Sequence, residues 1–312
     1  MSGSFFGKQV KHFVYSRKEG ITLNLTEAAL YAKERVNERP DTKGRLAGRL
    51  AVVTGGAQGF GLGIARQLIA EGATVVLADL NEAQAKEAAK EFDGRAFGLP
   101  VDVSDAASCE NMVAQAVEAM GGIDLFISNA GVLKAGGLDE LTPEQFAFVT
   151  KVDYTGYFNC VRAVAPVMRA QHEAAPEKWF DIVQINSKSG IVGSKKNFAY
   201  AGAKFGGVGL TQSFALELVD YGIKVNSVCP GNYYDGPLWS DPERGLFVQY
   251  LHAGKVPGAK TVEEVKEYYL SKSPIRRGCT PEDVAKAVFY CVEQCFETGQ
   301  AIPVTGGQVM LG

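Results

Sequence analysis

The chain has 312 residues, of which 46% are hydrophobic and 21% charged, enough for one large domain with a full core. The formal net charge of −3 gives no positive field that would gather nucleic acid, and no run of eighteen apolar residues predicts a membrane span. With three histidines and six cysteines in no CxxC pair, we expect no metal site and a cytoplasmic protein with reduced thiols.

Residues 1–48 are predicted to be an N-terminal extension, with a mobile start and a helix over 25–38. Thr26 is the expected N-cap of this helix, and Pro40 is expected to prevent its continuation. Residues 49–312 are expected to form a single domain.

From residue 49 onward, short apolar runs alternate with stretches of helical length. The expected strands are 50–55, 74–79, 95–103, 123–131, 179–187, 222–231 and 300–307. The expected helices are 60–72, 82–92, 108–122, 143–171, 198–221 and 281–295. Such alternation forms right-handed βαβ units, so we predict an α/β fold with a doubly wound parallel sheet of about seven strands and helices on both faces.

Residues 232–275 interrupt this alternation with tyrosines, prolines and charges, and only 262–270 has a helical pattern. A long irregular insert in an α/β domain usually lies over the functional site. We therefore predict a small substrate lid at about 232–275.

A glycine-rich turn, TGGAQGFGLG, lies where the first strand meets the first helix. Gly55, Gly59 and Gly61 leave room for a tight turn that brings backbone amides, and Phe60 beside them, close to a ligand. The helix N-terminus then favours a pyrophosphate, and the position between strand and helix makes the turn a candidate dinucleotide site.

Asp79 ends the second predicted strand, roughly 20 residues after the turn, where a ribose-binding acid is expected. A carboxylate there accepts hydrogen bonds from a 2′-hydroxyl and repels a 2′-phosphate, so the expected cofactor is NAD. The alternative is that Asp79 is a plain helix N-cap.

The stretch 185–204 contains Ser187 and the pair Tyr200-x-x-x-Lys204. On a helix, residues four apart share a face, so the lysine stands beside the tyrosine. Together with the positive nicotinamide, its ammonium is expected to lower the pKa of the phenol toward that of a useful base.

In their order along the chain, these motifs resemble those of the short-chain dehydrogenase/reductase family. The resemblance covers residues 49–311 and implies a Rossmann-type fold and a homodimer or homotetramer, often formed through the long helices near 149–168 and 205–219. The landmarks are the glycine turn, Asp102-Val103, Asn129-Ala130-Gly131, Ser187, Tyr200-x-x-x-Lys204, Pro230-Gly231 and TGQAIPVTGG at 298–307.

The resemblance also implies roles for single residues. Tyr200 would be the acid/base, Ser187 would orient the substrate oxygen, and Lys204 would hold the nicotinamide ribose. The remaining expected cofactor contacts are Asp102 and Val103 at the adenine, Asn129 and Gly131 at the ribose and nicotinamide, and Pro230 and Gly231.

Two positions depart from the family pattern. Asp153 stands where the family usually has an asparagine that helps hold a water near the active-site lysine, and we expect its charge to stabilise the ammonium of Lys204 and alter the pH dependence. Asp235 stands where a threonine more often binds the carboxamide, which weakens the case for nicotinamide anchoring there.

Segments 186–213, 268–279 and 298–310 resemble family members that act on sugar-alcohol phosphates. This implies the interconversion of a sugar-alcohol phosphate and a keto-sugar phosphate. Lysines and arginines in loops expected at the carboxyl edge of the sheet are candidate phosphate ligands, with Lys188 and Lys195 preferred over Lys134, Lys196, Arg276 and Arg277.

Three alternatives stay open at this point. The substrate could be an unphosphorylated polyol or another secondary alcohol, on which the tyrosine-rich lid could stack. The chain could instead be a non-catalytic NAD-binding regulator, although that role would not need Ser187, Tyr200 and Lys204. Residues 1–48 could form an interface.

Overall fold

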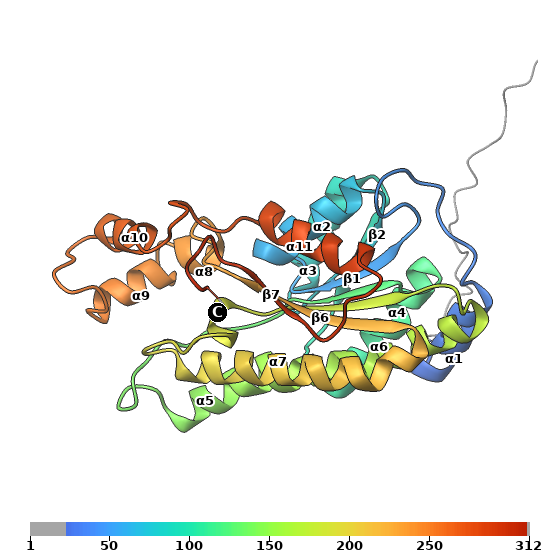
Figure 1. Ribbon diagram of the computed structural model, residues 1–312, viewed down its shortest axis with the longest axis horizontal. Helices are drawn as coiled ribbons and strands as arrows, with labels where there is room; N and C mark the ends of the chain where they lie inside the picture. Colours follow the sequence, from blue (N-terminus) through green and yellow to red (C-terminus); the bar gives the residue numbers. More distant parts are fainter. Residues whose placement is uncertain (1–22, 311–312) are drawn as a thin grey trace, which may run out of the picture.

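A seven-stranded parallel sheet forms the centre of the protein, whose computed structural model describes residues 23–310 (Figure 1). The strand order is β3-β2-β1-β4-β5-β6-β7, which is the order of a Rossmann-type doubly wound fold. The strands are β1 (Leu50–Thr54), β2 (Thr74–Asp79), β3 (Ala96–Pro100), β4 (Leu125–Ser128), β5 (Phe180–Ile185), β6 (Ile223–Pro230) and β7 (Ala301–Val304).

The sheet has its switch point between β1 and β4, because β1 pairs with β2 on one side and with β4 on the other. Every residue of β1, β4, β5 and β6 is buried, as expected for parallel strands covered on both faces. The predicted fold class is confirmed, including the strand number.

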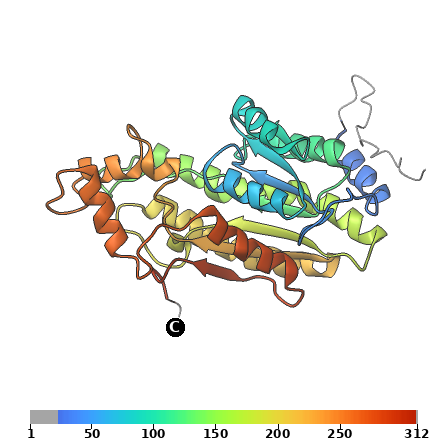
Figure 2. The same cartoon turned by 90° about the horizontal axis from the view of Figure 1, so that it is seen from above.

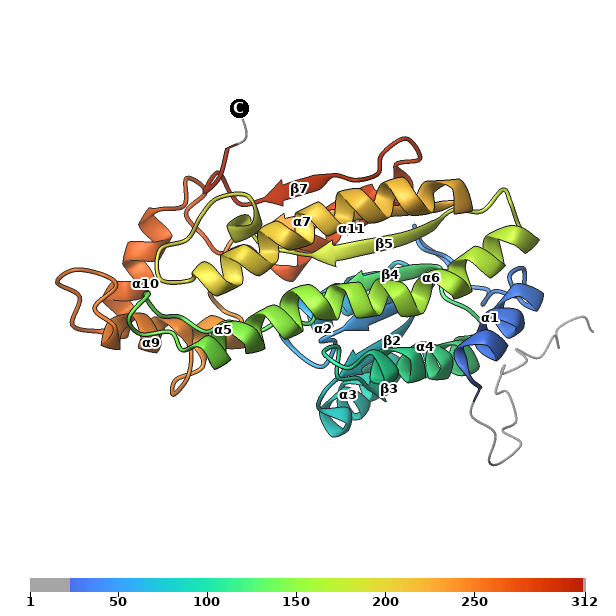
Figure 3. The same ribbon diagram turned by 90° about the horizontal axis from the view of Figure 1, so that it is seen from below.

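Helices cover both faces of the sheet (Figures 1 and 3). One layer contains α2 (Gly59–Ala70), α3 (Glu82–Ala89) and α11 (Pro281–Glu293). The opposite layer contains α4 (Ala106–Met120), α6 (Gly156–Ala174) and α7 (Phe198–Leu218). Each layer buries its own apolar cluster against the sheet, so two cores hold the strands in place.

The segment before β1 packs on the second helix layer. Helix α1 (Leu25–Glu34) lies against α4 and α6 and buries Ala28 and Ala32 (Figure 3). Its N-cap is Asn24, which accepts from the Glu27 N–H and completes a capping box, so the prediction of Thr26 as N-cap is wrong. The helix ends at Glu34, four residues earlier than predicted, and the expected mobile start lies outside the described residues.

The long helix predicted over 143–171 is interrupted. It divides into α5 (Pro143–Thr150), a π-helical turn at Lys151–Thr155, and α6. Such a turn inserts one residue into the α-helical ladder and often occurs at functional sites. Here it contains Asp153, whose side chain is thereby directed into the protein, with an exposed fraction of only 2%.

Residues 232–275, the predicted lid and hereafter called the lid, form three short helices where the sequence predicted one. These are α8 (Pro237–Ser240), α9 (Leu246–His252) and α10 (Val262–Ser271), and Figure 2 shows the orange segment projecting beyond the end of the sheet. Trp239 packs edge-on against Tyr234, Phe247 and Tyr250, with ring centroids 5.0 to 5.6 Å apart. This apolar cluster, hereafter the lid cluster, comprises Tyr234, Trp239, Leu246, Phe247, Tyr250, Val256 and Val265.

Within residues 23–310, no helix combines the length and the apolar character needed to cross a membrane.

Candidate active site

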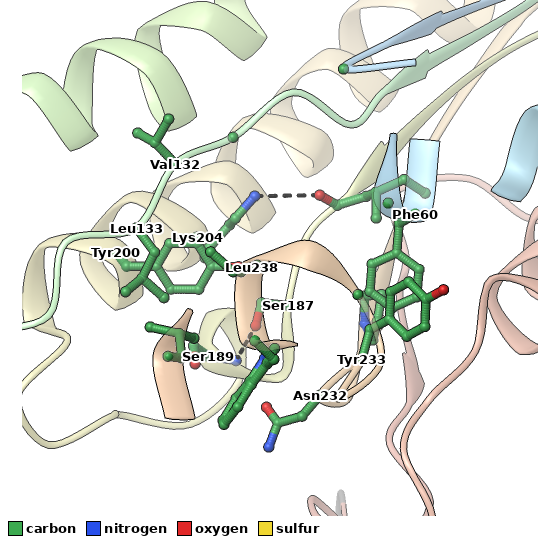
Figure 4. A pocket seen from close by; sticks show the side chains of 18 of the residues that line it. Phe60, Val132, Leu133, Ser187, Ser189, Tyr200, Lys204, Asn232, Tyr233 and Leu238 are labelled. Carbon is green, nitrogen blue, oxygen red and sulfur yellow. Dashed lines mark hydrogen bonds between the residues drawn. The ribbon is translucent and has the colours of Figure 1, made fainter. Parts of the chain in front are cut away.

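A cavity of about 1230 Å³ opens at the carboxyl ends of the strands and extends beneath the lid (Figure 4). Its lining comes from the segments that follow β1, β2, β3, β4, β5 and β6, and from the lid itself. It brings together most of the residues predicted from the sequence: Gly55, Gly59, Phe60, Asp79, Asp102, Val103, Asn129, Gly131, Ser187, Lys188, Lys195, Tyr200, Lys204, Pro230 and Gly231. Gly61, Lys134 and Asp153 are not part of the lining.

The glycine turn has the geometry that requires glycine. Gly55 and Gly59 have φ of +62° and +59°, a region that side chains disfavour. A Cβ atom on Gly61 would lie 2.1 Å from the carbonyl oxygen of Gly55, so Gly61 acts by close packing within the turn and not by lining the cavity. The amide of Asn129 fixes the turn by donating to the carbonyls of Thr54 and Gly55.

The N-terminus of α2 faces this cavity through Gln58, Gly59 and Phe60. Gln58, the N-cap, makes no side-chain capping hydrogen bond, so the first amides of the helix are not capped from within. The ring of Phe60 packs 4.8 Å from that of Tyr233, which belongs to the segment entering the lid (Figure 4). This turn fits the pyrophosphate of a dinucleotide, because it offers amides and a positive helix end.

Asp79 sits at the end of β2 with one carboxylate oxygen accepting from the Ala57 N–H, 3.1 Å away. The other oxygen accepts from the Asn81 N–H. The N-cap of α3 is Asn81, which accepts from Gln84, so the alternative of Asp79 as a plain N-cap is wrong. The carboxylate is left beside the glycine turn, where a nucleotide ribose would be expected.

Ser187, Tyr200 and Lys204 lie on one side of the cavity, opposite Phe60 and Tyr233 (Figure 4). The Lys204 Nζ atom is 5.4 Å from the centre of the Tyr200 ring and donates to the carbonyl of Ile185 at 3.3 Å. The Ser187 hydroxyl accepts from the Ser189 N–H, which fixes the oxygen at the start of a 3-10 turn. The i, i+4 spacing on α7 thus places a phenol and an ammonium side by side, as predicted.

Burial raises the pKa of the Tyr200 phenol above its ordinary value, and the charge on Lys204 and the Ser187 hydroxyl only partly offset this. The ammonium of Lys204 thus lowers the pKa of the phenol in the predicted direction, but without a cofactor burial outweighs it. Burial is the largest single influence on Lys204 and opposes its charge, but the combined influence of its neighbours, mainly Tyr200 and Asp153, raises the pKa of the lysine above its ordinary value.

Asp153 lies behind the cavity wall. Its Oδ1 atom accepts from the Val132 N–H at 2.7 Å, and its Oδ2 atom lies 3.8 Å from Lys204 Nζ without a hydrogen-bond partner among the described residues. Burial raises the pKa of this carboxyl to about 6, against the lowering influence of Lys204. Asp153 therefore lies beside Lys204 but outside the lining of the cavity.

The other departure, Asp235, does not line the cavity. It is exposed and lies 3.5 Å from the ammonium of Lys266. Nothing in this arrangement gives Asp235 a role at the nicotinamide end of the site.

The cations predicted to bind a phosphate divide into two groups. Lys188 and Lys195 line the cavity, whereas Lys134 does not. Lys196, Arg276 and Arg277 are also absent from the lining; Lys196 pairs with Glu140, and Arg277 pairs with Asp283. Three lid residues that the sequence analysis missed do line it: Arg244, Lys255 and Lys272. Only the folding of the lid brings these three cations near the sheet, so no local sequence motif predicts them.

No group of three or more His, Cys, Asp and Glu side chains among residues 23–310 could hold a metal ion.

The chain resembles known proteins along most of its length. The family described as short chain dehydrogenase matches residues 49–239. Sorbitol-6-phosphate 2-dehydrogenase of Escherichia coli K12 is 38% identical over 269 residues, which are 84% of this chain and 99% of the relative. Galactitol 2-dehydrogenase of Agrobacterium fabrum C58 is 33% identical over 269 residues, which are 85% of this chain and 99% of the relative.

Solved structures of related proteins show the same similarity. The crystal structure of sorbitol-6-phosphate 2-dehydrogenase SrlD from Erwinia amylovora superposes with a TM-score of 0.76 at 41% identity, covering 84% of this chain and all of that one. The NADP active-site complex of Pseudomonas aeruginosa RhlG superposes with a TM-score of 0.72 at 25% identity, covering 84% of this chain and 97% of that one. The chain therefore belongs to the short-chain dehydrogenase family of oxidoreductases.

Proposed function

We propose that the protein is an NAD-dependent dehydrogenase that interconverts sorbitol 6-phosphate and fructose 6-phosphate. The observation that carries the catalytic part is the placement of Ser187, Tyr200 and Lys204 on one wall of a cavity that also contains the glycine turn. The similarity to two sorbitol-6-phosphate 2-dehydrogenases supports the substrate. Residues 49–312 would form the catalytic domain, with residues 232–275 as its lid.

Bound NAD would supply the hydride acceptor. In the oxidation, the Tyr200 oxygen takes the proton of the substrate hydroxyl while a hydride leaves the same carbon, so the alcohol becomes a ketone. The ammonium of Lys204 balances the charge on the phenolate, and its position beside the ring is held by Ile185 and Asp153. The Ser187 hydroxyl, oriented by the Ser189 N–H, donates to the substrate oxygen.

Asp79 supports NAD over NADP. Its carboxylate accepts from Ala57 and Asn81 at the end of β2, and we assign to it the 2′-hydroxyl of the adenosine ribose. A 2′-phosphate there would meet a like charge. Asp102 also lines this cavity, adding a further acid to the predicted adenine end.

Steady-state kinetics test the substrate. With NAD, kcat/KM should be higher for sorbitol 6-phosphate than for free sorbitol by about tenfold or more, since charge-assisted hydrogen bonds to the phosphate are lost with the unphosphorylated sugar. Equal efficiency on both compounds would overturn the phosphorylated substrate and leave the second candidate, a dehydrogenase of an unphosphorylated polyol. The similarity to galactitol 2-dehydrogenase favours that candidate.

Replacing Tyr200 by Phe separates an enzyme from a non-catalytic NAD-binding regulator. The variant should bind NAD as the wild type does and form NADH at a rate lower by roughly 10² to 10⁴, the usual contribution of a positioned acid or base. A wild type that binds NAD and oxidises no polyol would favour the regulator.

We also propose a homo-oligomer. Phe146 and Phe148 of α5, Phe158 of α6 and Phe205 of α7 are each 45 to 46% exposed on the same helix layer. A mass measurement in solution on the full chain, and on a chain lacking residues 1–48, would give the assembly size and show whether that segment contributes to it.

A further inference from the structure

Three lysines converge on the cavity from segments that are distant in the sequence. Lys188 begins the 3-10 turn after β5, next to the predicted catalytic Ser187. Lys255 lies between α9 and α10, and Lys272 is the C-cap residue of α10. All three line the cavity, so one cation comes from the sheet and two come from the lid.

These lysines are close enough to repel one another. Burial and, to a smaller extent, the charge on Lys272 lower the pKa of Lys188 to about 8. Burial likewise lowers the pKa of Lys255, which repulsion from Lys188, Lys272 and Lys196 helps to bring to about 8. Among residues 23–310, no carboxylate forms an ion pair with Lys188, Lys255 or Lys272.

Aromatic rings hold the two lid lysines in place. The Lys255 Nζ atom lies 3.8 Å from the centre of the Tyr250 ring, and Lys272 Nζ lies 4.0 Å from that of Tyr268. Tyr250 in turn stacks on Tyr269 at 5.5 Å, within the packed part of the lid. Cation–π contacts of this kind orient an ammonium without neutralising its charge.

The lysines lie at the substrate end of the cavity and not at its nucleotide end. The Tyr250 hydroxyl accepts from the amide of Asn197, the N-cap residue of α7, at 2.9 Å. Asn197 precedes Tyr200 by one helical turn, so the ring that carries Lys255 is anchored beside the predicted acid/base. Asp79, at the predicted nucleotide end, is the last residue of a different strand, β2.

We propose that Lys188, Lys255 and Lys272 together form the subsite for the phosphate group of the substrate, and that a bound phosphate links the lid to the sheet. The identity of the sugar rests on the proposed function, whereas the subsite itself needs only the phosphate. A phosphate dianion would offset the repulsion among the three ammonium groups, and each ammonium would donate a charge-assisted hydrogen bond to its oxygens. A neutral polyol offers no such compensation. Lys195, which is exposed, is not required.

The test uses the full chain with Lys188→Gln and the double variant Lys255→Gln/Lys272→Gln. Lys286→Gln is the control, because Lys286 is exposed on α11 and does not line the cavity. For sorbitol 6-phosphate with saturating NAD, KM should rise by about tenfold or more in the double variant. Its kcat/KM for free sorbitol should not fall, and the control should match the wild type in both.

Isothermal titration with inorganic phosphate, at constant ionic strength set with chloride, tests the subsite without any turnover. The wild type should bind phosphate, and the double variant should bind it about tenfold more weakly or worse. Thermal melts check that each variant is folded. If the double variant does not fold, Lys188→Gln tests the subsite independently, because it removes the cation that comes from the sheet.

The outcomes are distinguishable. A wild type that binds inorganic phosphate through these lysines but does not oxidise sorbitol 6-phosphate would overturn the proposed substrate and support the subsite. A wild type that binds no phosphate, or variants that bind it as tightly as the wild type, would overturn the subsite even if sorbitol 6-phosphate is oxidised.

Discussion

The carboxylate of Asp153 lies 3.8 Å from the ammonium of Lys204, with both side chains almost completely buried. The π-helical turn at Lys151–Thr155 makes this pairing possible, because it directs Asp153 inward beside the backbone of Val132. Lys204 in turn neighbours the ring of Tyr200. The charge of Asp153 therefore raises the pKa of both Lys204 and the predicted acid/base Tyr200.

Asp153→Asn is expected to shift the pH profile of polyol oxidation to lower pH. Asp153 raises the pKa of Tyr200 and of Lys204, so removing its charge makes the phenolate easier to form. The acid limb of kcat/KM should move by about 0.5 to 1 pH unit, a shift typical of one nearby charge. A profile and rate identical to those of the wild type would show that Asp153 does not tune the site, and unchanged NAD binding serves as the control for folding.

The same substitution should alter the pH dependence of stability. The pKa of Asp153 is raised to about 6 in the folded protein, above its unfolded value, so the native state binds the extra proton between these values. The contribution of Asp153 to the stability of the folded protein then becomes less favourable as pH rises through about 4 to 6. Thermal melts from acid to neutral pH should show Asp153→Asn gaining stability relative to the wild type over this window. A constant difference in Tm would contradict the buried, titrating carboxyl.

The strands and the site motifs could be predicted because each is encoded locally. The apolar run at β1, the glycines after it and the i, i+4 spacing of Tyr200 and Lys204 all depend on neighbouring residues. The π-helical turn could not be predicted, because the helical pattern of residues 143–171 continues without a break across it. The N-cap of α1 was predictable, because Asn24-x-x-Glu27 has the spacing of a capping box and Thr26 does not.

The residues at the substrate end of the cavity could be predicted only in part, because tertiary structure brings them together. Lys188 could be predicted because it lies in a loop expected at the carboxyl edge of the sheet. Lys255 and Lys272 reach the cavity only through the packing of Trp239 and Tyr250 in the lid. Arg277 was a candidate by position, but Asp283 on the first turn of α11 pairs with it. Which loop lysines and arginines can bind a phosphate therefore depends on which of them the fold leaves without a carboxylate partner.

Phosphate binding at the lysine subsite should weaken as pH rises through about 8. The pKa values of Lys188 and Lys255 are lowered to about 8, so both ammonium groups are present below that pH and are lost above it. Burial raises the pKa of the neighbouring Tyr250 to about 12, so the ring hydroxyl stays neutral throughout. Titrations with inorganic phosphate from about pH 7 to pH 9 should show the Kd rising in the wild type. The double variant Lys255→Gln/Lys272→Gln should show a flatter dependence.

Asp79→Ser should relax the preference for NAD. Removing the carboxylate removes both the acceptor for the ribose hydroxyl and the repulsion of a 2′-phosphate, so the NAD to NADP ratio of kcat/KM should fall by about tenfold or more. Asp220→Asn, an exposed change distant from the cavity, is the control. A ratio that stays constant in Asp79→Ser would place the ribose elsewhere. An initial preference for NADP in the wild type would overturn the assignment of the cofactor itself.

Arg39→Met should destabilise the protein through the segment that precedes β1. The guanidinium of Arg39 donates to both carboxylate oxygens of Asp124, at 2.8 and 3.1 Å, and Asp124 is only 3% exposed. Removing the cation leaves a buried carboxylate, a loss expected to cost about 3 kcal/mol in the free energy of unfolding. Arg45→Met removes a comparable pair with Glu293 in which both side chains are nearly half exposed, and should cost less than about 1 kcal/mol. Urea unfolding of the two variants measures the difference, and equal losses would show that this segment contributes no more than a surface contact.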